Sequence, residues 1–303
     1  MSILVEQVSK LYGEQKALDD VNFAVSSGEV IGFLGPNGAG KSTMMKIISG
    51  FIPPNEGKVT VCGHDVLSET LEVKKKVGYL PEHNPLYLDM YVKEYFEFVG
   101  SVYKIPNLKA RIKEMIDRVG LELEQHKQIG ALSKGYRQRV GIAQAMIHDP
   151  EVLILDEPTS GLDPNQLVEI RNLISSIGKE KTVMLSTHIM QEVEAICSRV
   201  LIINRGKVVA DKPVNEIRST LSSSGYELKV EFSSEVSATE LKKIQGVHGA
   251  IQADGNNWTL EVSTNEDVRQ YVFNYAVEHN NSVLTMQRVE KSMEDVFKEL
   301  TSL

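Results

Sequence analysis

Short apolar runs recur along the first two thirds of the chain and predict buried strands. Val30–Leu34 is apolar at every position except one glycine, which is typical of a strand covered on both faces. The segments 3–8 and 21–25 are bounded by Gly and Asp turns and also predict strands. Three later runs share the composition of the first: Val152–Leu155, Thr182–Ser186 and Val200–Ile203.

Helical spacing separates these runs. The segment that begins at Lys41 predicts a helix, which Gly50 and the Pro53-Pro54 pair end. From about Val92 to Arg139 apolar residues recur every three or four positions, which predicts a helical region. Strands that alternate with helices predict an α/β core with a mainly parallel sheet.

The composition changes at residues 219–225, Ser-Thr-Leu-Ser-Ser-Ser-Gly, and predicts a linker there. A large domain then spans residues 1–218, and a small α+β domain spans residues 226–303. The predicted elements of the small domain are strand 226–232, helix 237–245, a hairpin turning at 254–257, helix 266–278, strand 283–289 and helix 293–300. This βαββαβ order is that of a ferredoxin-like unit.

Composition and charge exclude several classes of protein. No apolar run of the 303 residues approaches the roughly 18 needed to cross a bilayer, and the acidic N-terminal segment does not resemble a signal peptide. The net charge of -8 argues against a protein that coats nucleic acid. Cys62 and Cys197 lie far apart without metal-ligand spacing, so we expect free core thiols, with a disulfide as the alternative.

A glycine-rich loop joins the apolar run that ends at Leu34 to the following helix. Its pattern G-x-x-x-x-G-K-S lets successive backbone N–H groups surround the phosphates of a nucleotide. The Lys41 ammonium would bind the β and γ phosphates, and the Ser42 hydroxyl would bind Mg²⁺. An accidental glycine-rich turn is the alternative. The predicted ATP-binding residues of this phosphate loop are Gly35, Pro36, Asn37, Gly38, Ala39, Gly40, Lys41, Ser42 and Thr43.

Two carboxylates follow the apolar run Val152–Leu155. Asp156 is the predicted second ligand of Mg²⁺, as the acidic partner of a phosphate loop. Glu157 comes next and is the predicted catalytic base, because a carboxylate there can orient or deprotonate the attacking water. A solvated turn at the end of a strand is the alternative interpretation of this pair.

Four motifs in this order resemble the nucleotide-binding subunits of ABC transporters. They are the phosphate loop, Leu132-Ser-Lys-Gly-Tyr-Arg-Gln-Arg139, Leu155-Asp-Glu-Pro-Thr-Ser-Gly-Leu-Asp163 and Ser186-Thr-His188. The resemblance covers about residues 1–218. It implies a P-loop NTPase cassette with a helical subdomain at about residues 83–139, and hydrolysis of ATP with Mg²⁺ as cofactor.

The resemblance also implies roles for residues outside the phosphate loop. Ser133 and Gly135 would contact the γ phosphate held by the other protomer. Asp163 would lie in the loop that communicates between the two ATP sites. His188 would bind the γ phosphate and orient water beside Glu157. Tyr12 would stack on adenine, a role that an aromatic face suits.

The sequence departs from the family pattern at two places. Lys134 and Tyr136 replace the first Gly and the Gln of the usual Leu-Ser-Gly-Gly-Gln signature. Glu82 stands where the family has a Gln that binds Mg²⁺; a carboxylate can bind the metal but cannot donate a hydrogen bond. Both variants resemble bacterial drug, polysaccharide and gliding-motility exporters, and the overall likeness is greatest to the gliding-motility ATPase subunit.

The implied mechanism is ATP-dependent dimerisation that drives a separate membrane permease. The partners would be a second copy of the chain or a homologous cassette, and a permease that the helical stretch contacts. The chain would be cytoplasmic and peripheral on the inner face of the membrane. An aromatic cluster could add to the permease contact, although core packing is the alternative for most of its rings: Tyr87, Tyr91, Tyr95 and Phe96.

Two other functions compete with this one. A soluble ABC ATPase acting on ribosomes or DNA would usually carry two cassettes or a long coiled coil, and the chain shows neither. A non-hydrolytic nucleotide sensor would be expected to lack Glu157 or His188, and both are present. For the small C-terminal domain we expect dimer support or regulation, with a simple structural extension or ligand sensing as alternatives.

Overall fold

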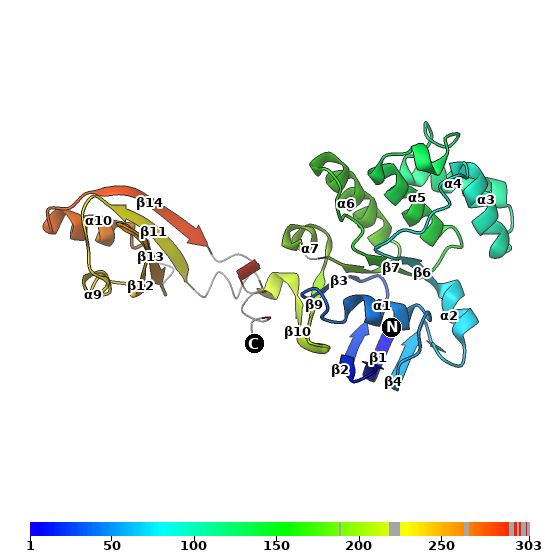
Figure 1. The fold of residues 1–303 in the computed structure, drawn as a ribbon, viewed down its shortest axis with the longest axis horizontal. Helices are drawn as coiled ribbons and strands as arrows, with labels where there is room; N and C mark the ends of the chain where they lie inside the picture. The colour runs from blue at the N-terminus through cyan, green and yellow to red at the C-terminus, as the bar shows by residue number, and fades with distance from the viewer. Residues whose placement is uncertain are drawn as a thin grey trace. The chain divides into compact units, whose positions relative to one another are not determined.

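The computed structural model describes residues 1–187, 189–217, 225–263 and 267–290, and residues 294, 295, 297 and 301. The chain forms two compact units, Met1–Val214 and Asn215–Leu303 (Figure 1). Of the predicted linker 219–225, all but Gly225 lies outside the described residues. His188 and five of the eight residues of the predicted helix 293–300 also lie outside them.

The centre of the first unit is a six-stranded sheet in the order β10-β9-β3-β8-β7-β6. All neighbours are parallel except β10, which pairs antiparallel with β9. The apolar runs of the sequence form its buried strands, so the mainly parallel α/β core is confirmed. The strands are β3 (Val30–Leu34), β6 (Val77–Leu80), β7 (Val152–Asp156), β8 (Thr182–Ser186), β9 (Arg199–Asn204) and β10 (Lys207–Pro213).

A second, antiparallel sheet has the order β2-β1-β4-β5. The strands predicted at 3–8 and 21–25 belong to it, where they extend to β1 (Ile3–Tyr12) and β2 (Gln15–Val25). The other two strands are β4 (Glu56–Val61) and β5 (His64–Asp65). Helix α1 (Lys41–Ile48) contacts strands of both sheets. Its buried apolar residues are Met44, Met45, Ile47 and Ile48.

The helical stretch of the sequence forms three helices, α3 (Val92–Val102), α4 (Leu108–Val119) and α5 (Lys134–Met146). Figure 1 shows them together beside the edge of the sheet formed by β7 and β6. The aromatic cluster divides, because Tyr95 and Phe96 are buried whereas Tyr87 and Tyr91 are about half exposed. The other helices of this unit are α2 (Thr70–Lys76), α6 (Pro164–Gly178) and α7 (Met190–Ile196).

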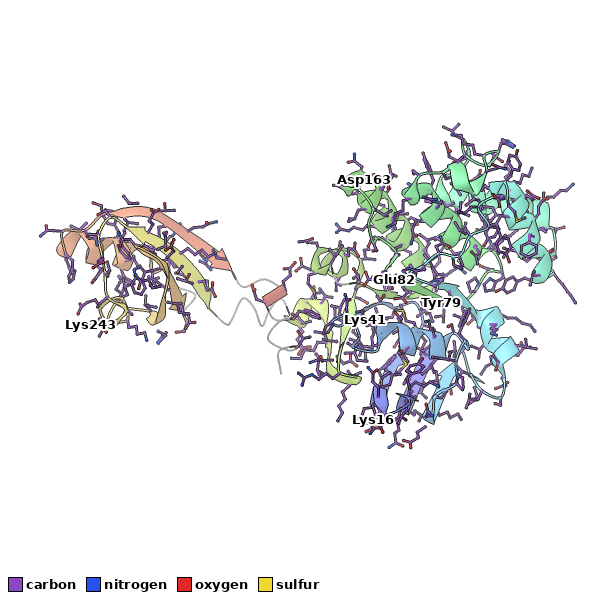
Figure 2. All side chains as sticks on the ribbon, in the orientation of Figure 1. Lys16, Lys41, Tyr79, Glu82, Asp163 and Lys243 are labelled. Atoms are coloured by element: carbon purple, nitrogen blue, oxygen red, sulfur yellow. The ribbon has the colours of Figure 1, made fainter. Side chains whose placement is uncertain are left out.

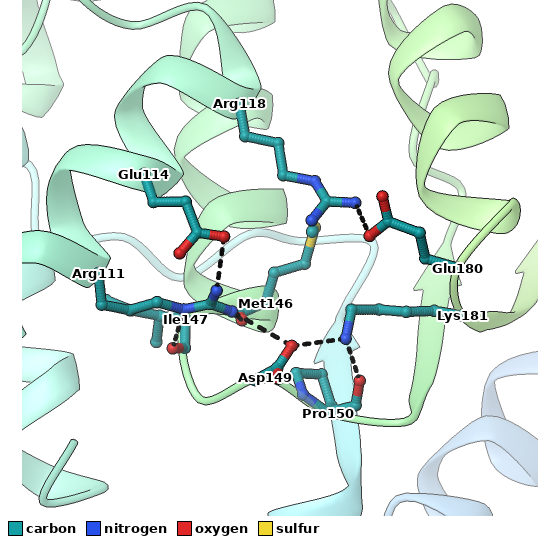
Figure 3. A network of polar contacts seen from close by, with 9 residues as sticks. All are labelled: Arg111, Glu114, Arg118, Met146, Ile147, Asp149, Pro150, Glu180 and Lys181. Carbon is teal, nitrogen blue, oxygen red and sulfur yellow. Dashed lines mark hydrogen bonds and ion pairs between the residues drawn. The ribbon is translucent and has the colours of Figure 1, made fainter. Parts of the chain in front are cut away.

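A polar network joins the three-helix region to the sheet (Figure 3). The Arg111 guanidinium of α4 donates to two main-chain carbonyls at the end of α5, at 2.8 and 2.9 Å. Asp149, just before β7, binds the Lys181 ammonium at 2.7 Å, and Arg118 of α4 binds Glu180 at 2.7 Å. Residues from α4, α5 and the starts of β7 and β8 therefore meet in one set of contacts.

The second unit has an antiparallel sheet in the order β12-β13-β11-β14. Along the chain its elements are β11 (Tyr226–Phe232), α9 (Ala238–Leu241), β12 (Val247–Asp254), β13 (Asn257–Val262), α10 (Arg269–Glu278) and β14 (Val283–Glu290). The hairpin between β12 and β13 turns where the sequence predicts it. The core consists of apolar and aromatic side chains such as Leu228, Phe232 and Trp258.

Candidate active site

The phosphate loop follows β3 and ends at α1. Gly40 precedes the helix with φ of 111°, and a Cβ there would lie 2.5 Å from the Ala17 carbonyl oxygen. A Cβ on Gly35 would overlap the Ile203 carbonyl. Both positions therefore require glycine, which allows the loop backbone to pass close to β2 and β9.

Lys41 is the first residue of α1 and is 8% exposed. Its ammonium donates to the carbonyl oxygens of Gly35 at 2.6 Å and Pro36 at 3.2 Å, so it crosses its own loop. Burial lowers the pKa of Lys41, whereas nearby carboxylates raise it, in the order Glu157, Asp156 and Glu82. The structure thus brings these three predicted acidic residues around the lysine, and Figure 2 shows Lys41 and Glu82 in one neighbourhood.

Asp156 and Glu157, at the end of β7, both contact Ser186 at the end of β8. Asp156 is 2% exposed and accepts a hydrogen bond from the Ser186 hydroxyl at 2.5 Å. The backbone N–H of Glu157 donates to the same hydroxyl oxygen at 3.0 Å. Glu157 has φ of 50°, an uncommon conformation for a residue with a side chain. Ser186 therefore fixes both acidic residues.

The oxygen ligands around Lys41 suit Mg²⁺. The buried Asp156 carboxylate, the half-buried Ser42 hydroxyl and the exposed Glu82 carboxylate are hard donors, which Mg²⁺ prefers. Within the described residues no group of three or more His, Cys, Asp and Glu side chains could bind a metal alone. A Mg²⁺ ion here would take its remaining ligands from nucleotide phosphates and water, as is usual for this metal.

The predicted signature loop, Leu132–Tyr136, lies at the start of α5. Ser133 caps the helix and accepts a hydrogen bond from the Tyr136 N–H at 3.4 Å, and Gly135 is buried. Asp163 caps α6 by accepting from two backbone N–H groups at 3.0 Å. Figure 2 shows Asp163 apart from Lys41 and Glu82. The structure therefore separates Asp163 from the phosphate loop of the same chain.

Tyr12 lies at the end of β1 and is 51% exposed. The Lys10 ammonium stands 5.6 Å from the centre of its ring. An exposed ring next to a cation can stack on a nucleotide base, which matches the role implied for this residue.

Two polar residues of this region, Tyr79 and Thr187, were not predicted as site residues. The buried Tyr79 hydroxyl has no hydrogen-bond partner among the described atoms. Burial is the main cause that raises the pKa of Tyr79, and the charges of Asp156 and Glu82 raise it further. The buried Thr187 hydroxyl donates to Glu192 at 2.6 Å and accepts from the Ile189 N–H at 3.1 Å, so it holds the residues on either side of His188. The sequence signal was the polar Ser186-Thr187 pair at the end of an apolar strand.

The chain is similar to known proteins over both of its units. Residues 18–160 match the family model "ABC transporter", and residues 213–301 match "ATP-binding protein DrrA1-3-like, C-terminal domain". The chain is 40% identical over 198 residues to the ABC transporter ATP-binding protein NatA of Bacillus subtilis, covering 64% of this chain and 80% of NatA. The chain belongs to the ATP-binding proteins of ABC transporters.

Further relatives extend over more of this cassette protein. It is 32% identical to the linearmycin resistance ATP-binding protein LnrL of Bacillus subtilis, over 98% of this chain and 97% of LnrL. It is 37% identical to the bacitracin transport ATP-binding protein BcrA of Bacillus licheniformis, over 72% of each chain. A dimeric structure of the bacterial ABC transporter cassette MJ0796 matches with a TM-score of 0.64 and 27% identity, over 70% of this chain and 98% of that one.

Membership of the family makes the protein an ATP-hydrolysing subunit of an ABC transporter. Among its described residues no helix is both long and apolar enough to span a membrane.

Proposed function

We propose that the protein is the ATPase subunit of a bacterial exporter of drug or peptide-antibiotic type. Its C-terminal unit carries this proposal, because residues 213–301 match the C-terminal domain of DrrA1-3-like proteins and LnrL aligns along nearly the whole chain. The names of LnrL and BcrA concern linearmycin resistance and bacitracin transport. None of the relatives described above concerns gliding motility, so that narrower prediction has no support.

Each ATP would be bound by the phosphate loop of one protomer. Lys41 would exchange its contacts with the Gly35 and Pro36 carbonyls for phosphate oxygens. Ser42, Asp156 and Glu82 would hold Mg²⁺, which neutralises phosphate charge. Tyr12 would stack on the adenine.

Hydrolysis would depend on Glu157 and His188. Glu157 would orient and deprotonate the attacking water, in a turn fixed by its N–H contact with Ser186. His188 would bind the γ phosphate beside it. The Asp156 carboxylate is held by the Ser186 hydroxyl, so this carboxylate would not have to reorganise during the reaction.

The second half of each site would come from another protomer. Ser133, Gly135 and Asp163 lie at the starts of α5 and α6, and this arrangement suits an ATP molecule held by a second copy or by a homologous cassette. ATP would then stabilise the closed dimer through contacts that the open state lacks. The permease would be a separate membrane protein, and the ATPase would be peripheral on the cytoplasmic face of the membrane.

The C-terminal unit is inferred to be ferredoxin-like and to support or regulate the dimer. Its βαββαβ order and its antiparallel sheet β12-β13-β11-β14 support the first inference. A protein that ends at Ser222 should keep ATP binding and self-associate more weakly in sedimentation velocity. Unchanged self-association would refute the role in dimerisation.

Partner capture tests the proposed function. The Glu157→Gln protein, held in ATP, is used to capture partners from gently solubilised membranes, and mass spectrometry identifies them. A multi-span membrane protein at equal stoichiometry is the expected result. Recovery of ribosomal or nucleic-acid proteins without a permease would refute the exporter and favour the soluble class.

A further inference from the structure

The signature loop and the segment after Glu157 touch through two reciprocal contacts. A Cβ on Gly135 would lie 2.6 Å from Cδ of Gln166, so the Gln166 amide packs directly against that glycine. A Cβ on Gly161 would overlap the Lys134 ammonium. Each segment therefore places one long side chain on a glycine of the other.

These contacts explain the departure from the family signature at Lys134. The residue replaces a glycine, and its side chain reaches from the start of α5 to Gly161. Gly161 has φ of 67°, a conformation that favours glycine, and the missing side chain leaves room for the ammonium. Gly135 in turn leaves room for Gln166, which is half-buried on the first turn of α6.

The segment that Lys134 contacts is a compact turn that begins at the proposed catalytic base. We name Glu157–Asp163 the catalytic turn. The Ser160 N–H donates to the Glu157 carbonyl at 3.2 Å, and the Leu162 N–H donates to the Thr159 carbonyl at 3.3 Å. Asp163 ends the turn and binds the Gln166 N–H at 3.0 Å. A shift of Gly161 or Gln166 would therefore be transmitted through this turn towards Glu157.

We propose that Lys134 and Gln166 are positioning residues that fix the signature loop to the catalytic turn of the same protomer. This inference rests on the proposed function, in which the signature loop faces the partner's ATP and Glu157 faces the protomer's own ATP. Engagement of the signature loop by the partner's γ phosphate then sets the position of Glu157. The pair thus links the two ATP sites within one chain.

A double-mutant cycle on the full chain tests this role with Lys134→Met, Gln166→Ala and the double variant. Met keeps the length of the stem and removes the ammonium. We expect each single variant to lower kcat about tenfold and the Hill coefficient for ATP towards one, with less than additive loss in the double variant. ATP affinity, measured in a Glu157→Gln background, and Tm stay at the parental values. Lys134→Arg restores most of kcat because it keeps the cation.

Lys113→Met is the matched control, because Lys113 is an exposed lysine on α4, which belongs to neither segment, and it should leave kcat unchanged. Unchanged kcat and Hill coefficient in the Lys134 and Gln166 variants would overturn the positioning role alone. A fall in Tm that parallels the fall in kcat would also overturn it, since the contacts would then be merely structural. A wild-type Hill coefficient of one, with specific activity constant on dilution, would contradict the dimeric mechanism itself and overturn both proposals.

Discussion

The cassette buries polar and charged side chains such as Lys41, Asp156, Thr187 and Glu192, whereas the buried side chains described in the C-terminal unit are apolar or aromatic. Burial of a polar group costs free energy unless a partner satisfies it, and a buried charge costs more. Among the described residues, buried polar and charged side chains therefore mark the cassette, which holds the proposed ATP site, and not the C-terminal unit.

The contrast between the cassette and the C-terminal unit is tested most strongly at Glu157. Glu157→Gln keeps the size of the side chain and removes the proposed base, so kcat should fall roughly 1,000-fold while ATP affinity stays within about twofold. Steady-state ATPase assays and equilibrium binding of a fluorescent ATP analogue measure the two quantities. Glu122→Gln, at an exposed position of the cassette, is the control. A kcat within tenfold of the wild type would remove Glu157 from the role of base.

The C-terminal unit should show the opposite behaviour. Leu228 is fully buried in its core, so Leu228→Ala should lower the stability of this unit by about 3 kcal/mol and leave the ATPase rate unchanged. Trp258 is the only tryptophan of the chain and lies in this core, so its fluorescence during urea unfolding reports on this unit. Leu284→Ala, at a 60% exposed position, should change stability by less than about 0.5 kcal/mol. Loss of ATPase activity in Leu228→Ala would show that the two units depend on each other.

Acid should destabilise the cassette through His148. Its ring stacks on the Tyr103 ring, with the ring centres 4.1 Å apart. Burial lowers the pKa of His148 from 6.5 to about 4. Between these values the unfolded chain binds a proton that the folded cassette does not, so stability is lost as pH falls from about 6.5 towards 4. Between pH 7.5 and 5 this residue should cost about 2 kcal/mol.

Scanning calorimetry of the wild type and of His148→Phe measures this effect, and the variant should lose less stability on acidification. The transition followed by Trp258 fluorescence is the internal control, and it should depend on pH equally in both proteins. Equal acid sensitivity of the cassette transition in both proteins would contradict the assignment to His148.

The smallest effect is expected at the cap of α6. Asp163→Ala removes an acceptor that two N–H groups share, and should lower cassette stability by about 1 kcal/mol. Asp163→Asn keeps an acceptor oxygen and should lower cassette stability by only about 0.3 kcal/mol. Thermal unfolding of both variants distinguishes the cap from the charge, and equal losses would show that the charge matters more.

The sequence was most informative where one local pattern decides the structure. The run Val30–Leu34 and the glycines that follow predict β3, the phosphate loop and α1, because the continuous apolar run, the turn signal and the helix signal agree there. The separate antiparallel sheet was not predicted, because strands 3–8 and 21–25 carry no signal that distinguishes their partners. The contacts of Ser186 and Lys134 were also missed, since they join residues that only the tertiary fold brings together.

The Arg111 network has a mechanical consequence. Asp149 lies just before β7, and Asp156 ends that strand. The network therefore holds one end of a stiff strand whose other end leads to Asp156 and Glu157. Hydrogen bonds to β6 on one side and β8 on the other keep the strand from bending. A force applied to the three-helix region from outside would therefore displace Glu157 in the direction of β7, without a change in the strand itself.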